Sequence, residues 1–286
     1  MIYMQRNAYE DTTTKKVADL LKRLRKNCNV KDPEEVKLYI ARKKCGNSYK
    51  ENLIEAYAIF MRSIRQEWDK PFYRRYDKKR RAPKEELINF LIEHAKFPMS
   101  LKLSMSKDLG QRPIELTWLK VHDIDLTSGN VSITGAKHTI GREGKLKPRT
   151  LELLKQYITT RHLHSESIIF EKMSSEAFGN CYRQTRKRIA TRYNRPELKQ
   201  IQLYDFRRWK GTRTYKLTRS ILHTQQILGH SQNDIRATMK YITIEDEMGI
   251  WIPVVCDTDE QIQQAIQDDC IFVCQANGKT YFKKPA

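Results

Sequence analysis

Residues 227–241 of this 286-residue chain read ILGHSQNDIRATMKY. Gly229 follows an apolar run and is well placed to end a helix in the left-handed conformation that glycine adopts without strain. His230 comes directly after it, and Tyr241 follows a short polar run with a second helix start. Buried histidine and tyrosine are common in folded domains, so this pair alone predicts only a packed core. Whether the two residues carry out chemistry depends on what the rest of the chain supplies.

The charge of the chain indicates a polyanionic partner. It contains 54 lysines and arginines against 34 aspartates and glutamates, a formal net charge of +20. Such a field favours nucleic acid or an anionic membrane surface. No apolar run approaches the roughly 20 residues that span a bilayer. The N-terminus lacks a secretory signal core, and no strongly amphipathic basic helix stands out. Nucleic acid is therefore the predicted partner, and we expect a cytoplasmic, nucleoid-associated protein.

Metal sites and cofactors are not indicated. Six cysteines are scattered along the chain without an export signal, which favours reduced thiols. Cys270 and Cys274 fall on one face of a predicted strand, but no histidine or second cysteine pair lies near them in sequence. The sequence has neither a P-loop nor a carboxylate cluster of the kind that holds two Mg²⁺ ions. We expect no metal and no cofactor.

The first part of the chain, 1–72, predicts a helical domain. Asp32–Pro33 supplies an N-cap and a first-turn proline for a helix that Gly46 can end. A second helix opens at Ser48 and repeats its apolar residues at helical spacing, and a further apolar stripe lies upstream of both.

A strongly basic segment, 73–83, separates this domain from the rest of the chain. It is too charged to be buried, and Pro83 restarts a helix after it. A linker of this kind between two DNA-binding units would contact backbone phosphate. The candidate contacts are Arg74, Arg75, Lys78, Lys79, Arg80 and Arg81.

The second part, 84–249, predicts a mixed domain, and the chain as a whole reads as mostly α with a small β-sheet (α+β). Segments 130–134 and 144–148 bracket a glycine-containing turn and predict a β-hairpin. The tail, 250–286, predicts a helix over 258–269 and a hairpin that turns at Asn277–Gly278. The helices predicted in the mixed domain are 83–94, 112–121, 150–161, 174–193 (capped by Ser174 or Ser175), one around Arg207 and 222–228.

Three separated segments carry side chains suited to one reaction. LGQRPIELTWL (109–119) places Glu115 three residues after Arg112, where its carboxylate can steady the guanidinium. LYDFRRWKGT (203–212) supplies a tyrosine and an arginine, and 227–241 supplies the histidine and tyrosine quoted above. Taken singly, each residue has an ordinary surface or packing role, but their order changes that assessment. The set is Arg112, Lys137 in the predicted hairpin turn 25 residues later, Tyr204, Arg207, His230 and Tyr241.

This order resembles that of the tyrosine recombinases, also called the phage integrase family, over residues 84–245. The resemblance implies site-specific DNA recombination through a 3′-phosphotyrosyl intermediate, without metal or ATP. It also implies a helical core-binding domain ahead of the catalytic domain, and a homotetramer that acts on two duplexes at attachment-type sites. RPIELTWLKVHDIDL, LYDFR and FVCQANGKTYFKK look most like archaeal members. That likeness implies an archaeal virus or an integrated element as the source.

The resemblance also implies a role for each residue of the set. Arg112 and Arg207 would clamp the non-bridging phosphate oxygens in fork geometry and stabilise the charge of the transition state. Tyr241 would be the nucleophile.

Lys137 would be the general acid that protonates the leaving 5′ oxygen, with Lys145 and Lys147 as alternatives. His230 and Tyr204 would hydrogen-bond the phosphate or the leaving group.

The chain departs from the family pattern in three places. Tyr204 stands where a histidine is usual, although a phenol can still donate one hydrogen bond. Arg208 stands where a histidine often follows. The interval from His230 to Tyr241 is longer than usual, and Tyr215 is a weaker rival for the nucleophile.

Two other functions stay open at this point. A type IB topoisomerase-like enzyme would use similar chemistry on one duplex as a monomer. A relative that has lost catalysis would only bind DNA; the intact residue set argues against it, and the longer interval before Tyr241 keeps it open. The tail, 250–286, is long enough to dock on a neighbouring protomer, and packing on its own domain is an equal alternative.

Overall fold

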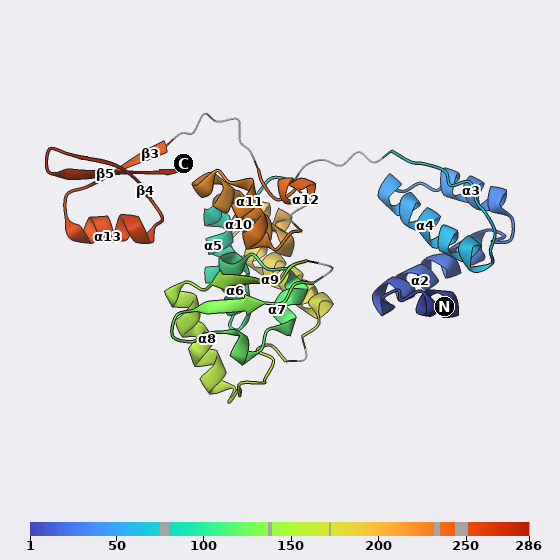
Figure 1. Ribbon diagram of the computed structural model, residues 1–286, viewed down its shortest axis with the longest axis horizontal. Coiled ribbons are helices and arrows are strands. Elements are labelled where there is room, and N and C mark those ends of the chain that lie inside the picture. The colour runs from blue at the N-terminus through green and yellow to red at the C-terminus, as the bar shows by residue number, and fades with distance from the viewer. Residues whose placement is uncertain (75–79, 137–138, 172, 232–234, 244–250, 286) are drawn as a thin grey trace. The chain divides into compact units, whose positions relative to one another are not determined.

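The computed structural model describes residues 1–74, 80–136, 139–171, 173–231, 235–243 and 251–285. They belong to two compact units, Met1–Lys78 and Lys79–Ala286 (Figure 1). Both units are mainly helical, and the strands form small antiparallel sheets, which confirms the mostly α fold that the sequence predicts. None of the described helices combines the length and the hydropathy that crossing a bilayer requires.

The first unit packs its helices around one apolar cluster. Leu24, Ile40 and Tyr57, from three different helices, are fully enclosed in this cluster. The tyrosine hydroxyl also donates to the carbonyl oxygen of Val30 over 3.0 Å, so its polar end is satisfied. The described helices of this unit are α1 (Ile2–Arg6), α2 (Asp11–Asn27), α3 (Pro33–Arg42) and α4 (Asn47–Ser63).

One predicted helix start in this unit is confirmed and one predicted end is wrong. The Asp32 side chain accepts hydrogen bonds from two main-chain N–H groups of the first turn of α3, as its cap should. Gly46 does not end that helix. It has an ordinary φ of −65° and is the N-cap of α4, while α3 ends at Arg42.

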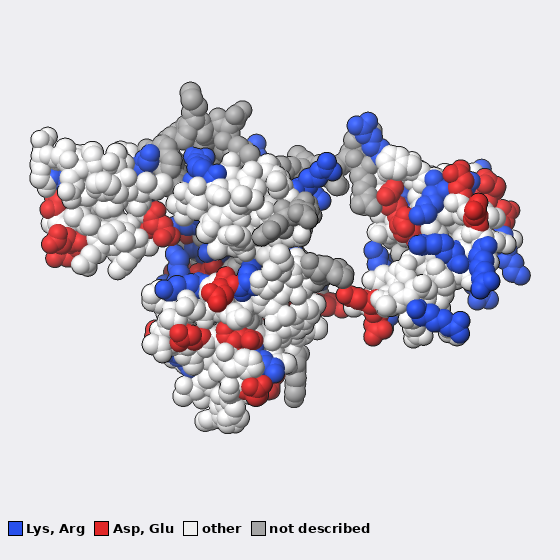
Figure 2. All heavy atoms as spheres, viewed as in Figure 1, with Lys and Arg blue, Asp and Glu red and all other residues white. Residues whose placement is uncertain are grey.

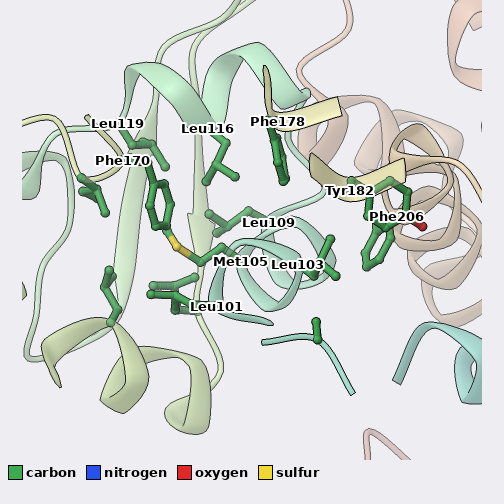
Figure 3. Close-up of a cluster of buried hydrophobic side chains, with 14 of the residues drawn as sticks. Leu101, Leu103, Met105, Leu109, Leu116, Leu119, Phe170, Phe178, Tyr182 and Phe206 are labelled. Carbon is green, nitrogen blue, oxygen red and sulfur yellow. The ribbon is translucent and has the colours of Figure 1, made fainter. Parts of the chain in front are cut away.

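The enclosed helix α6 (Met99–Leu109) organises the core of the second unit. Leu101, Leu103 and Met105 have no exposed surface, and such all-round burial requires neighbours on every side. Figure 3 shows these side chains among others from elsewhere in the chain, including Phe170 and Phe178. The elements in contact with α6 include α5 (Glu85–Glu93), α7 (Pro113–Trp118), α8 (Pro148–Thr160), α10 (Leu203–Thr218) and β2 (Arg142–Lys145).

The predicted hairpin is present with a shifted second strand. β1 (Asn130–Ile133) pairs antiparallel with β2, with Val131 opposite Gly144. The second strand begins at Arg142, two residues before the predicted start, and it ends early because Pro148 opens α8.

The remaining helices of this unit follow the predicted segments closely. Ser174, rather than Ser175, caps α9 (Ser175–Arg192) by accepting from the N–H of Ala177. Gly229 ends α11 (Ile221–Leu228) with φ 65°, as predicted. Three short elements complete the unit before its tail: the 3-10 turns Val121–Asp123 and Pro196–Gln200, and α12 (Ile235–Met239).

The tail contains the predicted helix and hairpin and one strand that was not predicted. Asn277 and Gly278 both adopt positive φ, at 52° and 73°, as a two-residue hairpin turn requires. The additional strand β3 contains Pro253, which counts against a strand assignment; it lies at the edge of the sheet, where proline is tolerated. The elements are β3 (Trp251–Cys256), α13 (Asp259–Gln267), β4 (Ile271–Ala276) and β5 (Lys279–Pro285), in strand order β3-β5-β4.

Core truncation should affect the two units separately, because their apolar clusters share no member. We expect Leu24→Ala and Leu116→Ala each to cost about 2–5 kcal/mol of the unfolding free energy of its own unit. Hydrogen exchange should show faster exchange confined to 1–63 in the first variant and to 85–243 in the second. Faster exchange of both units in either variant would contradict this independence.

Candidate active site

Arg112 is placed where the central helix α6 ends. α6 stops at Gly110 in the left-handed conformation, and Arg112 is the N-cap of α7, not part of the helix that was predicted to start with it. The Arg112 N–H donates to Glu115 Oε2, and its Nη1 donates to Glu115 Oε1, each over 2.8 Å. Nη1 also lies 3.0 Å from Thr139 Oγ1. One carboxylate therefore fixes both the backbone and the side chain of Arg112.

Glu115 has a second guanidinium partner that the motif order did not identify. Arg142 of β2 donates from Nη2 to Glu115 Oε2 over 2.9 Å. The Glu115 side chain is fully buried, which raises its pKa, but the hydrogen bonds and charges of Arg142 and Arg112 outweigh burial and hold the pKa at about 2. Glu115 is thus an ionised carboxylate at neutral pH. Its two positive partners come from segments far apart in the sequence, which is why spacing alone did not predict Arg142.

Arg207 of α10 joins three segments. Its Nη1 donates to the carbonyl oxygen of Gly110 over 2.8 Å, and its Nη2 donates to that of Leu228. Nη2 also lies 3.0 Å from His230 Nε2. Burial, together with the charges of Arg112 and Arg142, lowers the pKa of Arg207 to about 10, so the side chain stays cationic at neutral pH.

The contacts of His230 define its tautomer. A guanidinium can only donate, so His230 Nε2 accepts from Arg207. The proton must then lie on Nδ1, which is 2.9 Å from Thr238 Oγ1 and donates to it. Thr238 is fully buried in α12, three residues before Tyr241. The sequence did not identify a task for Thr238, and the structure shows that it orients the histidine.

Tyr241 lies against the His230 ring and the Arg207 guanidinium. Its ring centroid is 5.2 Å from that of His230 and 5.2 Å from the guanidinium carbon of Arg207. Its main-chain N–H donates to the carbonyl oxygen of Thr238, and its carbonyl oxygen accepts from Thr212 Oγ1 over 3.0 Å. The phenol is therefore held beside the two basic residues by its own backbone. The rival Tyr215 lies eight residues beyond Arg207, about 12 Å farther along α10.

The other predicted proton donors differ in how far the structure describes them. Tyr204, at the start of α10, is 40% exposed. Burial and the Tyr241 phenol raise the pKa of Tyr204 against the lowering effect of Arg112 and Arg207, so it is a hydrogen-bond donor at neutral pH. Lys137 lies outside the described residues. The two alternatives to it are both exposed: Lys145 lies in β2, and Lys147 is the N-cap of α8.

The basic linker is partly engaged by the protein itself. Arg80 pairs with Asp205 over 2.9 Å and donates to the carbonyl oxygen of Gln200. Arg74 and Arg81 are exposed. Three candidates, Arg75, Lys78 and Lys79, lie outside the described residues.

Metal ligands do not gather in the part of the chain that the structure describes. No group of three His, Cys, Asp or Glu side chains is arranged to hold a metal ion there. All six cysteines are free.

Comparison with known proteins identifies the family of the chain. The family model described as "Phage integrase family" matches residues 84–248, more than half of the chain. Curated protein sequences give no significant match.

Solved structures show the same fold at low sequence identity. The Tn1549 transposon integrase in complex with transposon right end DNA is 15% identical, with a TM-score of 0.65 over 92% of this chain and 95% of that one. A lambda integrase tetramer bound to a Holliday junction is also 15% identical, with a TM-score of 0.62 over 87% of this chain and 78% of that one. The XerH recombinase bound to its difH substrate is 17% identical, with a TM-score of 0.55 over 76% and 68%.

The low pKa of Glu115 predicts a defined pH dependence of stability. A carboxyl group whose pKa falls from 4.5 to about 2 on folding stabilises the protein above pH 4.5, and this contribution is lost as the pH falls through 2. We expect Glu115→Gln to lower the unfolding free energy at pH 7 by about 3 kcal/mol. The unfolding free energy, measured with denaturant, should also depend less on pH between 4.5 and about 2 in this variant. Glu152→Gln, at an exposed ion pair, is the control and should change neither. If the unfolding free energy of Glu115→Gln depended on pH as that of the native chain does, the low pKa assigned to Glu115 would be wrong.

Proposed function

Since this chain belongs to the phage integrase family of tyrosine recombinases, which cleave and rejoin DNA, we propose that it does so through Tyr241. The observation that carries the proposal is the position of the Tyr241 ring, 5.2 Å from the guanidinium of Arg207 and 5.2 Å from the ring of His230. A tyrosine that attacks a phosphate diester has to approach an anion. The buried guanidinium of Arg207 beside the phenol can bring that anion to it.

The reaction exchanges one phosphodiester bond for another. The Tyr241 hydroxyl attacks the scissile phosphorus and loses its proton, the bond to the 5′ oxygen breaks, and a 3′-phosphotyrosyl bond forms. Lys137 protonates the leaving 5′ oxygen in our assignment. In the reverse step a 5′ hydroxyl attacks the phosphotyrosine and releases Tyr241, so rejoining consumes no ATP.

Arg112 and Arg207 bind the non-bridging oxygens in this mechanism. Arg112 retains donors beyond those that engage Glu115, and its side chain is 11% exposed. Arg207 is 1% exposed and lies under the Tyr241 ring, so the ring has to shift when the phosphate enters. Fixed guanidinium groups suit this task because they present their donors in a planar fork.

In the same mechanism His230 positions Arg207, and Tyr204 is a hydrogen-bond donor. The Nε2 atom of His230 accepts from Arg207 and so orients one of the two phosphate ligands. Tyr204 projects from the first turn of α10 beside Arg112 and Arg207, where its hydroxyl can donate to the phosphate or the leaving oxygen.

The partner in this proposal is double-stranded DNA at attachment-type sites. Lys and Arg side chains form several patches on the visible surface of the first unit, with acidic and uncharged side chains between them (Figure 2). Residues 1–72 would serve as the core-binding domain, 73–83 as a linker along the phosphates, and 84–249 as the catalytic domain. A tail at 250–286 completes this division. The similar lambda integrase is a tetramer on a Holliday junction, which supports a homotetramer on DNA here as well.

The biological setting belongs to the same proposal. The archaeal-like segments quoted above support a virus or integrated element of an archaeon as the source. Integration into the host genome would then be the process served, next to the nucleoid in the cytoplasm.

Covalent trapping on nicked DNA tests the nucleophile. We expect the native chain, without added metal, to form a denaturation-resistant adduct with a nicked duplex that carries its attachment site. Tyr241→Phe should abolish the adduct, whereas Tyr215→Phe should leave it in place, because Tyr215 lies eight residues beyond the phosphate ligand Arg207 on α10. The adduct is measured by denaturing gel electrophoresis.

Two outcomes would redirect the proposal. If the adduct were lost in Tyr215→Phe and kept in Tyr241→Phe, Tyr215 would be the nucleophile in place of Tyr241. Relaxation of supercoiled DNA without strand exchange between two duplexes would favour a type IB topoisomerase-like activity.

Salt dependence of DNA binding tests the linker. Each phosphate contact contributes about 0.9 to the slope of log K against log salt. We expect Arg81→Ala to reduce the slope by about that amount, because Arg81 is exposed. Arg80→Ala is the matched comparison and should leave the slope nearly unchanged, since the Arg80 guanidinium is paired with Asp205. Equal loss of slope in both variants would show that Arg80 leaves Asp205 for the DNA.

A further inference from the structure

Arg142 is a buried arginine to which neither the motif order nor the proposed mechanism gives a role. Its side chain is 5% exposed, and Nη2 donates to Glu115 Oε2 over 2.9 Å. Its Nε and Nη1 atoms are enclosed and have no hydrogen-bond partner among the described residues. Enclosed donors without partners cost free energy, so a functional or structural gain must offset them.

The enclosure argues against direct contact between Arg142 and DNA. A phosphate oxygen accepts only from an N–H group that it can approach, and Nε and Nη1 of Arg142 have almost no accessible surface. The Arg112 side chain is more exposed, at 11%. Arg207 is enclosed as well, but it lies against the Tyr241 ring, whose shift opens it to the phosphate, whereas none of the described contacts of Arg142 involves Tyr241. Arg142 therefore acts through its protein partner, the carboxylate of Glu115.

Glu115 divides its oxygens between the two arginines. Oε1 accepts from Arg112 Nη1 and from the N–H of Ala136, and Oε2 accepts from the Arg112 N–H and from Arg142 Nη2. Burial raises the pKa of Glu115, and Arg142 lowers it more than any other neighbour. Without Arg142 the carboxyl group would protonate more readily and lose an acceptor site for Arg112.

Arg142 also brings β2 close to the turn that carries His230. A Cβ at Gly229 would lie 3.0 Å from both Cδ and Nη1 of Arg142, and 2.9 Å from the carbonyl oxygen of Ile140. The glycine thus permits a close approach as well as the left-handed backbone. The approach fixes the position from which Arg142 reaches Glu115.

We propose that Arg142 is a positioning residue for the transfer of the phosphoryl group: it holds the Glu115 carboxylate, and through it the Arg112 guanidinium, in the orientation that binds the scissile phosphate. The inference rests on the proposed function, since it takes Arg112 as a phosphate ligand.

The groups around Glu115 determine how the pH dependence is interpreted. Arg112 faces it from the N-cap of α7, Arg142 from β2, and Arg207 and Tyr204 from α10. Two more titratable groups, His230 and Tyr241, lie beyond Arg207. Apart from Arg142 itself, these groups are the same in native and variant chains, so a change confined to the acid range reports the loss of Arg142 from Glu115.

The first test is the rate of adduct formation on nicked DNA between pH 5 and 8. We expect Arg142→Gln to lower the rate about 10- to 100-fold, the size expected for a displaced catalytic group. The rate should also fall more steeply toward pH 5 than in the native chain. Arg142→Lys keeps the charge and should recover the native pH profile with part of the rate. The Kd for DNA should stay within about twofold in both variants, because Arg142 does not touch DNA in this assignment.

Arg186→Gln is the matched control. Arg186 also has a buried Nε without a described partner; it lies over the ring of Tyr182 and donates to the carbonyl oxygen of Ile201, and none of its described contacts involves Glu115 or Arg112. It should lower stability without changing the pH profile of adduct formation.

A second readout does not depend on catalysis. Acid unfolding of Arg142→Gln should have its midpoint at a higher pH than that of the native chain, and this shift should disappear when Glu115→Gln is added. The inference would be overturned if Arg142→Gln had the same pH profile of adduct formation and the same midpoint of acid unfolding as the native chain. It would also be overturned if the shift of that midpoint were undiminished in the double variant. Absence of any adduct from the native chain would instead reject the proposed function, and the acid midpoint would still decide whether Arg142 controls Glu115.

Discussion

The ionised carboxylate of Glu115, buried between two guanidinium groups, is the interaction on which the site depends. A buried carboxylate is costly unless cations and hydrogen bonds compensate it, and Arg112 and Arg142 supply both. In return, the carboxylate lets two like charges lie close together in the core. Without it, Arg112 and Arg142 would repel each other, and also Arg207, whose pKa is already lowered by burial and by their charges. The cluster therefore keeps a net positive charge for an anion while its members stay fixed.

Backbone carbonyl groups at helix ends give Arg207 its position. Gly110 ends α6 and Leu228 ends α11, and the last carbonyls of a helix lack partners within the helix. Arg207 donates to one carbonyl at each end. The same side chain donates to His230, whose other nitrogen is occupied by Thr238. A single buried side chain thus sets the relation between the central helix, α11 and the turn before α12.

A series of hydrogen bonds connects the linker to the backbone of Tyr241. The N–H of Ala82 donates to Thr243 Oγ1, the N–H of Thr243 donates to Thr212 Oγ1, and Thr212 Oγ1 donates to the carbonyl oxygen of Tyr241. The residues just after Tyr241 are thereby fixed between α10 and the end of the linker. This arrangement explains how the backbone beside the phenol is held although the interval from His230 is long.

The sequence by itself determined most of the helices, several of their caps and the order of the chemical residues, because these depend on neighbours a few positions apart. The enclosed helix α6 was not among the predicted helices. Asp32, Ser174 and Gly229 each act through the first or last turn of a helix, so local chemistry identifies them. Only the tertiary structure decided which distant groups share the site. Arg142 looked like any other basic residue of a charged chain until folding brought β2 against Glu115. In the folded protein the buried Arg142 stabilises the ionised form of the Glu115 carboxylate. This burial arises from contacts between distant segments, which the local spacing of residues does not encode.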